Sequence, residues 1–310
     1  MALEQRTPAA PVEEEESAPR AAARRGGPTS LLPYWLVLPT VIYVLLFFAW
    51  PMVRAFGLAF QDAEGGFTLQ HIERMLGDAN FADALRFTLV LLVVILPVQF
   101  IVALVMALLV NNQRLRGRGI FLYIYAIPLA VSELAAGIVW LAVFTEQGYL
   151  NTLLQGIGIL ERPFIWLNYQ EPQLLLLAVV LAEVWRATSL IMIILVAGLQ
   201  GIPRDYLEAA EVFGAGLWQR VRRVILPMLK PSIQVALIFR TILAFQVFAT
   251  VIALTGRGAT VLTAEAWRWH TSVRNANVAA AYAGLILVLS VVATALILRM
   301  LRTPPEQKLV

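Results

Sequence analysis

The sequence predicts an all-α, polytopic membrane protein with six transmembrane helices. Hydrophobic residues make up 60% of its 310 residues and charged residues only 14%, and the mean hydropathy is +0.75. Such a composition is typical of membrane-spanning chains rather than of soluble domains. The apolar residues gather in six segments, each near the roughly 20 residues that a helix needs to cross a bilayer. Most charged residues lie between these segments.

The two ends of the chain differ from the rest in composition. Residues 1–30 are rich in Ala, Pro, Glu and Arg and contain a run of four glutamates at 13–16. A segment with so few apolar residues cannot bury enough surface to fold, so we expect a disordered tail. The membrane domain is then expected at 31–302, followed by a second short tail at 303–310.

The six spans are placed where apolar runs reach membrane-crossing length. They are expected at 34–53, 87–110, 120–144, 174–199, 233–254 and 279–300. Pro39, Pro97 and Pro128 lie inside three of them. A proline removes one backbone hydrogen bond from a helix, so these positions indicate either simple kinks or openings toward a water-filled path.

The orientation follows from the basic residues, which gather in three stretches. These are 114–118, the central loop at 200–231, and 299–302. The positive-inside rule assigns such loops to the cytoplasm. The loop at 257–274 disagrees, with three arginines against one glutamate. Since three loops outweigh one, both termini and the central loop are expected in the cytoplasm.

Composition also excludes several classes of site. The net charge of +4 and the pI near 9.6 would suit nucleic acid, but the arginines cluster at the ends of apolar spans. No nucleic-acid partner is therefore expected, and the bilayer is the surrounding medium. There is no cysteine, and the two histidines, His71 and His270, are far apart in sequence. We expect no metal site and no disulfide.

Four ionisable residues lie deep inside the predicted spans: Glu133, Glu183, Arg186 and Arg240. Charges at such depth are unfavourable and indicate either a functional site or a pair of partners. Glu183 and Arg186 are three residues apart, so on a helix they could simply pair with each other. A carrier driven by an ion gradient, with Glu133 and Glu183 as its titrating groups, is one functional alternative.

The central loop is the longest charged stretch between two apolar spans. Residues 203–231 read PRDYLEAAEVFGAGLWQRVRRVILPMLKP and carry eight ionised side chains, so the stretch must lie in water. We expect one helix from Asp205 to Gly214 and a second helical piece after it. Pro227 and Pro231 are expected to break that second piece. From periodicity alone, a helix lying on the membrane surface and a docking helix are both possible.

Particular residues in this loop resemble a known motif. Glu208-Ala209-Ala210, then Gly214, then Val224 and Leu226-Pro227 resemble the EAA loop of ATP-binding-cassette (ABC) importer permeases, although Phe213 stands where many members carry Asp. The resemblance implies a type I ABC importer permease fold in a bacterial or archaeal plasma (inner) membrane. It also implies a cytoplasmic coupling helix that contacts an ATPase. The coupling positions it implies are Asp205, Glu208, Ala209, Ala210, Gly214, Ala215, Leu226 and Pro227.

Further residues resemble the carbohydrate-uptake, maltose- and trehalose-type branch of these permeases. They are Pro128, Ser132, Trp140, Gly148, Asn151, Val184-Trp185, Ala197-Gly198-Leu199, Ile202-Pro203 and Leu254-Thr255-Gly256 with Thr263. Arg257 and Ala259 depart from the branch's usual turn. The resemblance implies a sugar cargo, such as trehalose, maltose or another di- or oligosaccharide. It places sugar contacts at Glu183, Arg186, Ala187, Leu190, Arg240, Ala244 and Val247. The arginines leave a glycerol-phosphate-type cargo as an alternative.

The resemblance also implies partners. No phosphate-binding loop of the G-x-x-x-x-G-K-[ST] type is present, so ATP and Mg are expected on a partner ATPase and no cofactor on this chain. A second permease, a dimer of ATPase subunits and an extracytoplasmic solute-binding protein would complete the importer. The chain itself is then expected to be a permease subunit and not an enzyme.

Overall fold

A computed structural model describes residues 32–111, 117–256 and 258–301 of this chain. The described residues are almost entirely helical and form no strand beyond one isolated bridge between Gln61 and Phe67. The all-α prediction is therefore confirmed. The chain divides into two compact units, Met1–Pro51 and Met52–Val310. The predicted tails at 1–30 and 303–310 lie outside the described residues.

The described part of the first unit is one apolar helical run. It consists of α1 (Leu32–Val44), the π-helical turn η1 (Leu45–Ala49) and the first residues of α2 (Trp50–Gly57). Pro39 lies inside α1 without ending it. Large apolar side chains such as Tyr34 and Phe47 are exposed. Their exposure fits a helix whose surroundings are apolar rather than aqueous.

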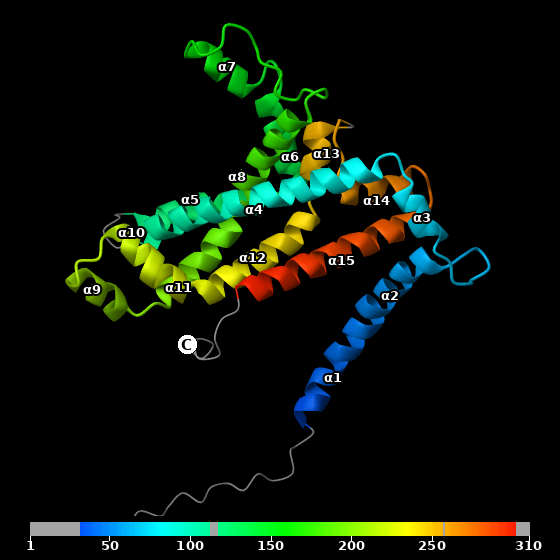
Figure 1. Ribbon diagram of the computed structural model, residues 1–310, viewed down its shortest axis with the longest axis horizontal. Helices are drawn as coiled ribbons and strands as arrows, with labels where there is room; N and C mark the ends of the chain where they lie inside the picture. The colour runs from blue at the N-terminus through cyan, green and yellow to red at the C-terminus, as the bar shows by residue number, and fades with distance from the viewer. Residues whose placement is uncertain (1–31, 112–116, 257, 302–310) are drawn as a thin grey trace, which may run out of the picture. The chain divides into compact units, whose positions relative to one another are not determined.

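The second unit contains the remaining helices, which Figure 1 shows in chain order. They are η2 (Leu58–Phe60), α3 (Gln70–Leu76), α4 (Phe81–Asn111), α5 (Arg118–Ala130), α6 (Glu133–Phe144), α7 (Tyr149–Gly156), α8 (Pro172–Gln200), α9 (Arg204–Val212), α10 (Leu217–Arg220), η3 (Val221–Ile225), α11 (Leu226–Met228), α12 (Lys230–Phe245), α13 (Ala249–Thr255), α14 (Leu262–Thr271) and α15 (Ala276–Met300).

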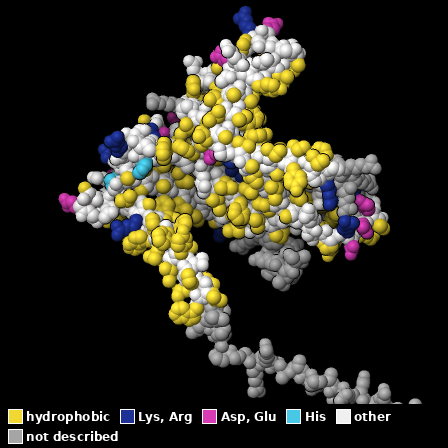
Figure 2. Space-filling model, turned by 180° about the vertical axis from the view of Figure 1, so that it is seen from behind, with side chains coloured by type: hydrophobic (Ala, Val, Ile, Leu, Met, Phe, Trp, Pro, Cys, Tyr) yellow, Lys and Arg dark blue, Asp and Glu magenta, His cyan; other side chains and the backbone are white. Residues whose placement is uncertain are grey.

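The long helices of the second unit pack side by side. Helix α4 contacts α8 along much of its length, and α12 packs against α4, α8 and α15 (Figure 1). Apolar side chains fill the space between them, as with Leu91 and Val179 in one cluster and Ile191 and Leu229 in another. Yellow hydrophobic side chains also cover much of the outer surface in Figure 2. That exposure is expected where lipid or a partner subunit replaces water.

The predicted spans agree with the structure in number but not in continuity. Four stretches are long and apolar enough to cross a membrane, namely Tyr34–Phe60, Phe81–Asn111, Pro172–Gln200 and Ala276–Met300, and there are up to six if each bent pair of helices is one span. The third predicted span is not one helix. Its first half ends at Ala130, and the helices on either side of this break are bent by 99°.

Local chemistry explains this break. Val131 is extended, and the hydroxyl of Ser132 accepts a hydrogen bond from the Ala135 N–H at 3.2 Å, which starts α6. Serine is favoured at this capping position because it satisfies a free amide of the first turn. The fifth predicted span, 233–254, is also interrupted, by Gln246–Phe248 between α12 and α13. The sequence analysis marked Pro128, shortly before the first break, as a kink or an opening, but it gave no sign of the second break because apolar composition alone does not reveal one.

The broken helices nevertheless pack closely. A Cβ added to Gly137 on α6 would lie 2.7 Å from Cβ of Ala253 and 3.1 Å from Cα of Thr250, both on α13. Since real Cβ atoms do not approach so closely, glycine at this position allows the two short helices to touch. This contact brings the two broken spans together at the polar cluster described next.

Candidate functional site

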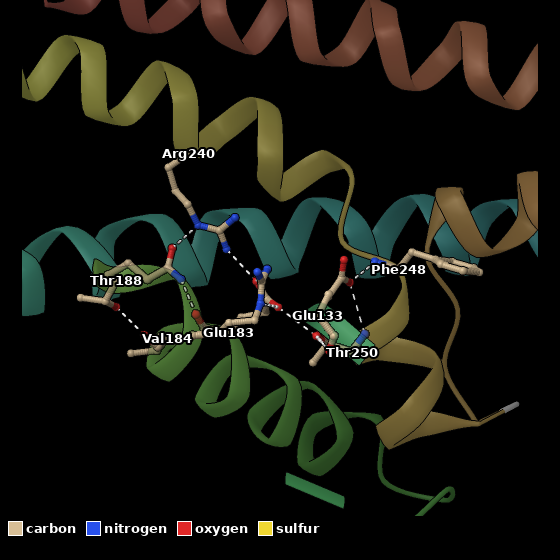
Figure 3. Close-up of polar contacts among 9 residues, drawn as sticks. Glu133, Glu183, Val184, Thr188, Arg240, Phe248 and Thr250 are labelled. Atoms are coloured by element: carbon tan, nitrogen blue, oxygen red, sulfur yellow. Dashed lines mark hydrogen bonds and ion pairs between the residues drawn. The ribbon is translucent and has the colours of Figure 1, made fainter. Parts of the chain in front are cut away.

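The centre of the second unit holds a buried carboxylate with four polar contacts (Figure 3). Glu183 on α8 has no exposed side-chain surface. Its Oε2 accepts from Nη2 of Arg186 at 3.0 Å and from Nη2 of Arg240 at 2.9 Å. Its Oε1 accepts from Nε of Arg186 at 3.1 Å and from the hydroxyl of Thr250 at 3.0 Å. The cluster therefore joins α8, α12 and α13.

Arg240 extends the cluster to α4. Its side chain is fully buried, and its Nε donates to Oε1 of Gln99 at 2.6 Å. The Gln99 amide donates in turn to the backbone carbonyl of Glu183 at 2.7 Å. Nη1 of Arg240 is buried and makes no hydrogen bond with any described residue. A buried guanidinium with one free donor has a hydrogen bond left to offer a ligand.

Glu133 links the two broken spans. It lies in the first turn of α6, and its Oε1 accepts from the backbone N–H of Phe248 at 2.6 Å and of Thr250 at 3.2 Å. These amides open α13, so a carboxylate from another helix caps it and stabilises its positive end. The Thr250 hydroxyl, which also reaches Glu183, lies 3.3 Å from the Glu133 carbonyl.

The formal charges of the cluster cancel. Two carboxylates, Glu133 and Glu183, lie beside two guanidiniums, Arg186 and Arg240; Glu183 and Arg240 are fully buried, whereas Glu133 and Arg186 are partly exposed. Charges inside a membrane are least unfavourable when they are paired in this way. The pairing of Glu183 with Arg186, which the sequence left open, is present in the structure, and Arg240 joins the pair.

The seven predicted sugar-contact positions are near one another but mostly covered. Five of them are buried: Glu183, Ala187, Arg240, Ala244 and Val247. Arg186 and Leu190 are partly exposed. In this conformation the protein itself occupies most of the polar groups of the site, with Nη1 of Arg240 as an exception. Gln99 and Thr250 were not predicted, although a glutamine inside an apolar span is itself a signal of a polar cluster.

The predicted coupling loop forms a protruding helix, α9. It begins at Arg204, one residue before the predicted start, and its described residues are not buried. Gly214 ends it with φ of +75°, the left-handed conformation that glycine adopts without strain. Its N–H donates to the Glu211 carbonyl at 2.9 Å, and the Ala215 N–H donates to the Ala210 carbonyl at 2.9 Å. Asp205, Glu208 and Ala209 all face solvent.

The helical run breaks between the two prolines at the end of the loop, where a break was predicted, although neither proline itself interrupts a helix. Pro227 lies within α11, directly after the π-helical turn η3, and Pro231 lies in the first turn of α12. A proline has no N–H and clashes with the carbonyl four residues earlier in a regular helix. The wider π-turn removes that clash. The helical run therefore continues through Pro227 and breaks at Leu229, where the helices on either side are bent by 71°.

The loop also exposes large apolar side chains. Val212 is 85% exposed and Phe213 is 89% exposed, and Leu217 and Trp218 lie just beyond them at 74% and 71%. A contiguous group of this kind in a charged loop marks an interaction surface. An ion pair between Arg220 and Glu211 joins the two sides of the turn that carries them.

Comparison with known proteins places this architecture in a family. The family described as binding-protein-dependent transport system inner membrane component matches residues 99–302. The trehalose/maltose transport system permease protein MalF of Thermococcus litoralis is 34% identical over 234 residues, covering 73% of this chain and 78% of the relative. The trehalose transport system permease protein SugA of Mycobacterium tuberculosis is 34% identical over 264 residues, covering 82% and 80%.

Two further similarities broaden the comparison. The sn-glycerol-3-phosphate transport system permease protein UgpA of Agrobacterium fabrum is 32% identical over 239 residues, covering 74% of this chain and 80% of the relative. A chain of the bacterial alginate ABC transporter, solved in complex with alginate pentasaccharide-bound periplasmic protein, superposes with a TM-score of 0.75 at 25% identity. That match covers 87% of this chain and 94% of the other.

These matches define the class of the protein as a membrane-embedded permease rather than an enzyme. The chain belongs to the family of binding-protein-dependent transport system inner membrane components, so it is a permease subunit of an ABC importer. Within the family it groups with the permeases of carbohydrate importers. This membership argues against the ion-driven carrier that the deep carboxylates had left open.

Proposed function

We propose that this chain is one of two permease subunits of an importer for a neutral di- or oligosaccharide such as trehalose or maltose. A second permease, a dimer of ATPase subunits that holds ATP and Mg, and an extracytoplasmic solute-binding protein complete the complex. The chain itself holds no cofactor. It lies in the plasma (inner) membrane of a bacterium or archaeon, with both termini and the central loop in the cytoplasm. The relatives named above and the basic loops support this arrangement.

The charge balance of the buried cluster is the observation that favours a neutral cargo. Arg186 and Arg240 both pair with Glu183, and Glu133 lies beside them. No net positive charge is left for a phosphate ester. Paired carboxylate and guanidinium groups instead suit sugar hydroxyls, which both donate and accept hydrogen bonds.

A glycerol-phosphate cargo remains the second candidate. The 32% identity to UgpA, named as an sn-glycerol-3-phosphate permease, favours it. It would require Glu183 to release its arginines so that both guanidiniums meet the phosphate. Removing a buried carboxylate from two cations is unfavourable unless the phosphate replaces it fully.

The sugar positions require a conformational change before they can bind cargo. In this conformation Glu183 and Arg240 are covered, while Arg186 and Leu190 remain partly exposed. A shift of α12 relative to α8 would open Glu183 and Arg240 to the sugar together with Ala187, Ala244 and Val247. Rocking of packed helices of this kind is the usual form of alternating access.

Helix α9 is the element that would drive this shift. It protrudes with Glu208 and Ala209 exposed, and the apolar group from Val212 to Trp218 follows it. We assign α9 as the coupling helix that docks into the ATPase. Glu208, Ala210 and Gly214 would shape the docking surface, while Leu226 and Pro227 close the loop against the bundle.

Uptake by the reconstituted importer tests the proposal. Labelled trehalose and maltose are compared with labelled glycerol 3-phosphate, with ATP supplied on the face that carries α9. Uptake of a disaccharide, absent without hydrolysable ATP, is the expected result. Uptake of glycerol 3-phosphate alone would mean that the cargo is an anion and not a neutral sugar. Uptake without ATP, driven by an ion gradient, would contradict the importer itself.

A further inference from the structure

A small hollow opens where α14 passes the break between α12 and α13. Its volume is 280 Å³, and its lining is Phe248 together with four residues of α14, namely Thr263, Ala266, Trp267 and His270. These four are spaced i, i+3, i+4 and i+7, so they form one face of the helix. The opposite face, including Leu262, packs into the core. On the face that lines the hollow, Thr263 and Ala266 are partly buried, whereas Trp267 and His270 are exposed.

The surface that lines the hollow is almost entirely apolar and includes two aromatic rings. The rings of Phe248 and Trp267 lie 5.9 Å apart at an interplanar angle of 58°, so they form two tilted walls. Trp267 is 55% exposed, and His270 is exposed beside it. Aromatic faces contact the apolar faces of other rings, and an imidazole donates and accepts hydrogen bonds. This is the chemistry that holds a pyranose ring, which has C–H faces and a rim of hydroxyls.

The size of the hollow limits the ligand. Pockets that bury a drug-sized molecule have volumes of roughly 300–1,000 Å³. At 280 Å³ this hollow is slightly smaller, and it is open on one side, so it would cover about one ring of a longer sugar.

Hydrogen bonds hold both sides of the hollow in place. The Phe248 N–H donates to Glu133 at 2.6 Å, and Figure 3 shows the Phe248 ring directed away from that carboxylate. The Thr263 hydroxyl donates to the Val247 carbonyl at 2.8 Å, which fixes α14 to the break. A site whose walls are already ordered loses less entropy when it binds a ligand.

The core side of α14 is equally well anchored. Arg268 donates to Glu265 at 2.5 Å and pairs with Asp78, which also accepts from the Trp269 indole at 2.5 Å. Burial opposes the charge of Arg268, but the hydrogen bond and charge of Glu265 together with Asp78 outweigh it and raise the pKa of that guanidinium. The helix that carries Trp267 is thus rigidly placed.

We infer that this hollow is an outer sugar subsite, which stacks one ring of the sugar on Trp267 and Phe248 before the sugar enters the bundle. The inference rests on the proposed sugar cargo and membrane orientation. It extends the predicted sugar-contact positions outward, because Val247 is the last of them and Phe248 follows it directly in the chain. The subsite would add affinity for sugar rings in general, while the buried cluster would form specific hydrogen bonds with the sugar hydroxyls.

Protection from a thiol reagent tests the subsite, because the chain contains no cysteine of its own. Ala266→Cys places a thiol on the floor of the hollow, and Ser272→Cys places a matched thiol on exposed surface at the end of the same helix. Both variants are assembled into the full importer and labelled from outside with a membrane-impermeant maleimide. We expect trehalose to slow labelling of Ala266→Cys several-fold and to leave Ser272→Cys unchanged.

Each other outcome overturns the subsite. Equal protection of both cysteines would show that a docked protein shields the surface, and no protection would show that no sugar binds there. Failure of Ala266→Cys to react without sugar would mean that lipid or the second permease fills the hollow. Uptake of labelled trehalose by the cysteine-free importer is measured in parallel. Uptake without protection refutes only the subsite, whereas absent uptake refutes the sugar cargo.

A kinetic comparison gives an independent readout. Trp267→Ala should raise the KM for sugar uptake about two- to tenfold, the range expected for one lost aromatic contact, while the maximal rate is retained. Trp267→Phe keeps a ring and should stay close to the unaltered protein. Tyr149→Ala, which removes a 70% exposed aromatic side chain on α7, is the control for loss of surface aromatics in general. An unchanged KM in Trp267→Ala, or an equal effect in Tyr149→Ala, contradicts the subsite.

Discussion

Glu183 keeps two guanidiniums within the apolar interior. Its two carboxylate oxygens receive Arg186, Arg240 and Thr250, and it has no exposed side-chain surface itself. An ion in a low-dielectric interior is tolerated only when its partners satisfy its hydrogen bonds. At the scale of single residues, the stability of the bundle centre therefore depends most on this one carboxylate.

Replacing Glu183 should strongly destabilise the permease. Glu183→Ala leaves Arg240 fully buried without its counter-ion, which costs about 3–5 kcal/mol for a buried pair. We expect a clear fall in the midpoint of thermal unfolding, measured by the fraction of purified complex that stays monodisperse on heating. Arg186→Ala is the matched control, because Arg186 is partly exposed and Glu183 keeps Arg240. If both variants unfold at the same temperature, the central role of Glu183 is wrong.

At the level of secondary-structure elements, the main feature is the contact between two broken spans. Helix α6 begins at Glu133 after the break at Val131 and Ser132, and α13 begins after the break that follows α12. Glu133 caps α13 across this junction, and Gly137 lets the two helices touch. Such breaks free backbone groups that a path through the bundle can use, provided that other groups satisfy them.

Glu133→Ala should loosen α13 without unfolding the long helices. Two amides would lose a charged acceptor, at a cost of about 1–3 kcal/mol for a buried unsatisfied donor. We expect faster hydrogen exchange at Phe248 and Thr250, measured by mass spectrometry, and unchanged exchange within α15. Glu133→Gln keeps an oxygen acceptor without the charge. Its exchange rates at Phe248 and Thr250 should lie between those of the unaltered protein and those of Glu133→Ala. Glu146→Ala, an exposed glutamate just beyond α6, is the surface control. Unchanged exchange at 248–250 in Glu133→Ala would argue against the cap.

The whole molecule exposes more apolar surface than a soluble chain could. On most helices lipid or a second permease is the natural cover, but α9 and the loop after it lie in a charged stretch that must be in water. The exposed group from Val212 to Trp218 is therefore best explained by a protein partner. At this scale the chain is one part of a larger assembly.

Changes on this surface should affect coupling and leave the fold intact. Glu208→Lys and Phe213→Ser replace exposed side chains, so insertion and thermal stability should stay within about 0.5 kcal/mol of the unaltered protein. We expect sugar uptake to fall at least tenfold, and ATP hydrolysis to become independent of sugar. Glu161→Lys makes the same charge reversal in the exposed loop before α8 and should import normally. Normal uptake in both loop variants would contradict the coupling role.

Local information was enough to predict the long helices. The spans expected at 87–110, 174–199 and 279–300 correspond to α4, α8 and α15, and the loop helix begins within one residue of its predicted start. The apolar composition and the length of a segment are properties of neighbouring residues, so the sequence shows them directly. A glycine at the end of a helical pattern, such as Gly214, is likewise visible in the sequence. Pro128 indicated a kink close to the break after Ala130, but the helix α14 and the break after Phe245 were not predicted, because their stretches are too short for a clear periodic signal.

The sequence by itself determined that this is a helical membrane permease with a long charged loop between two apolar spans, because hydropathy and motif spacing are local properties. Only the tertiary structure decided how its deep charges are satisfied. Arg240 meets Glu183 from 57 residues away and Gln99 from 141 residues away. No local pattern encodes such contacts, since they depend on how α4, α8 and α12 pack. The hollow beside Trp267 likewise exists only because α14 packs against a break in another span.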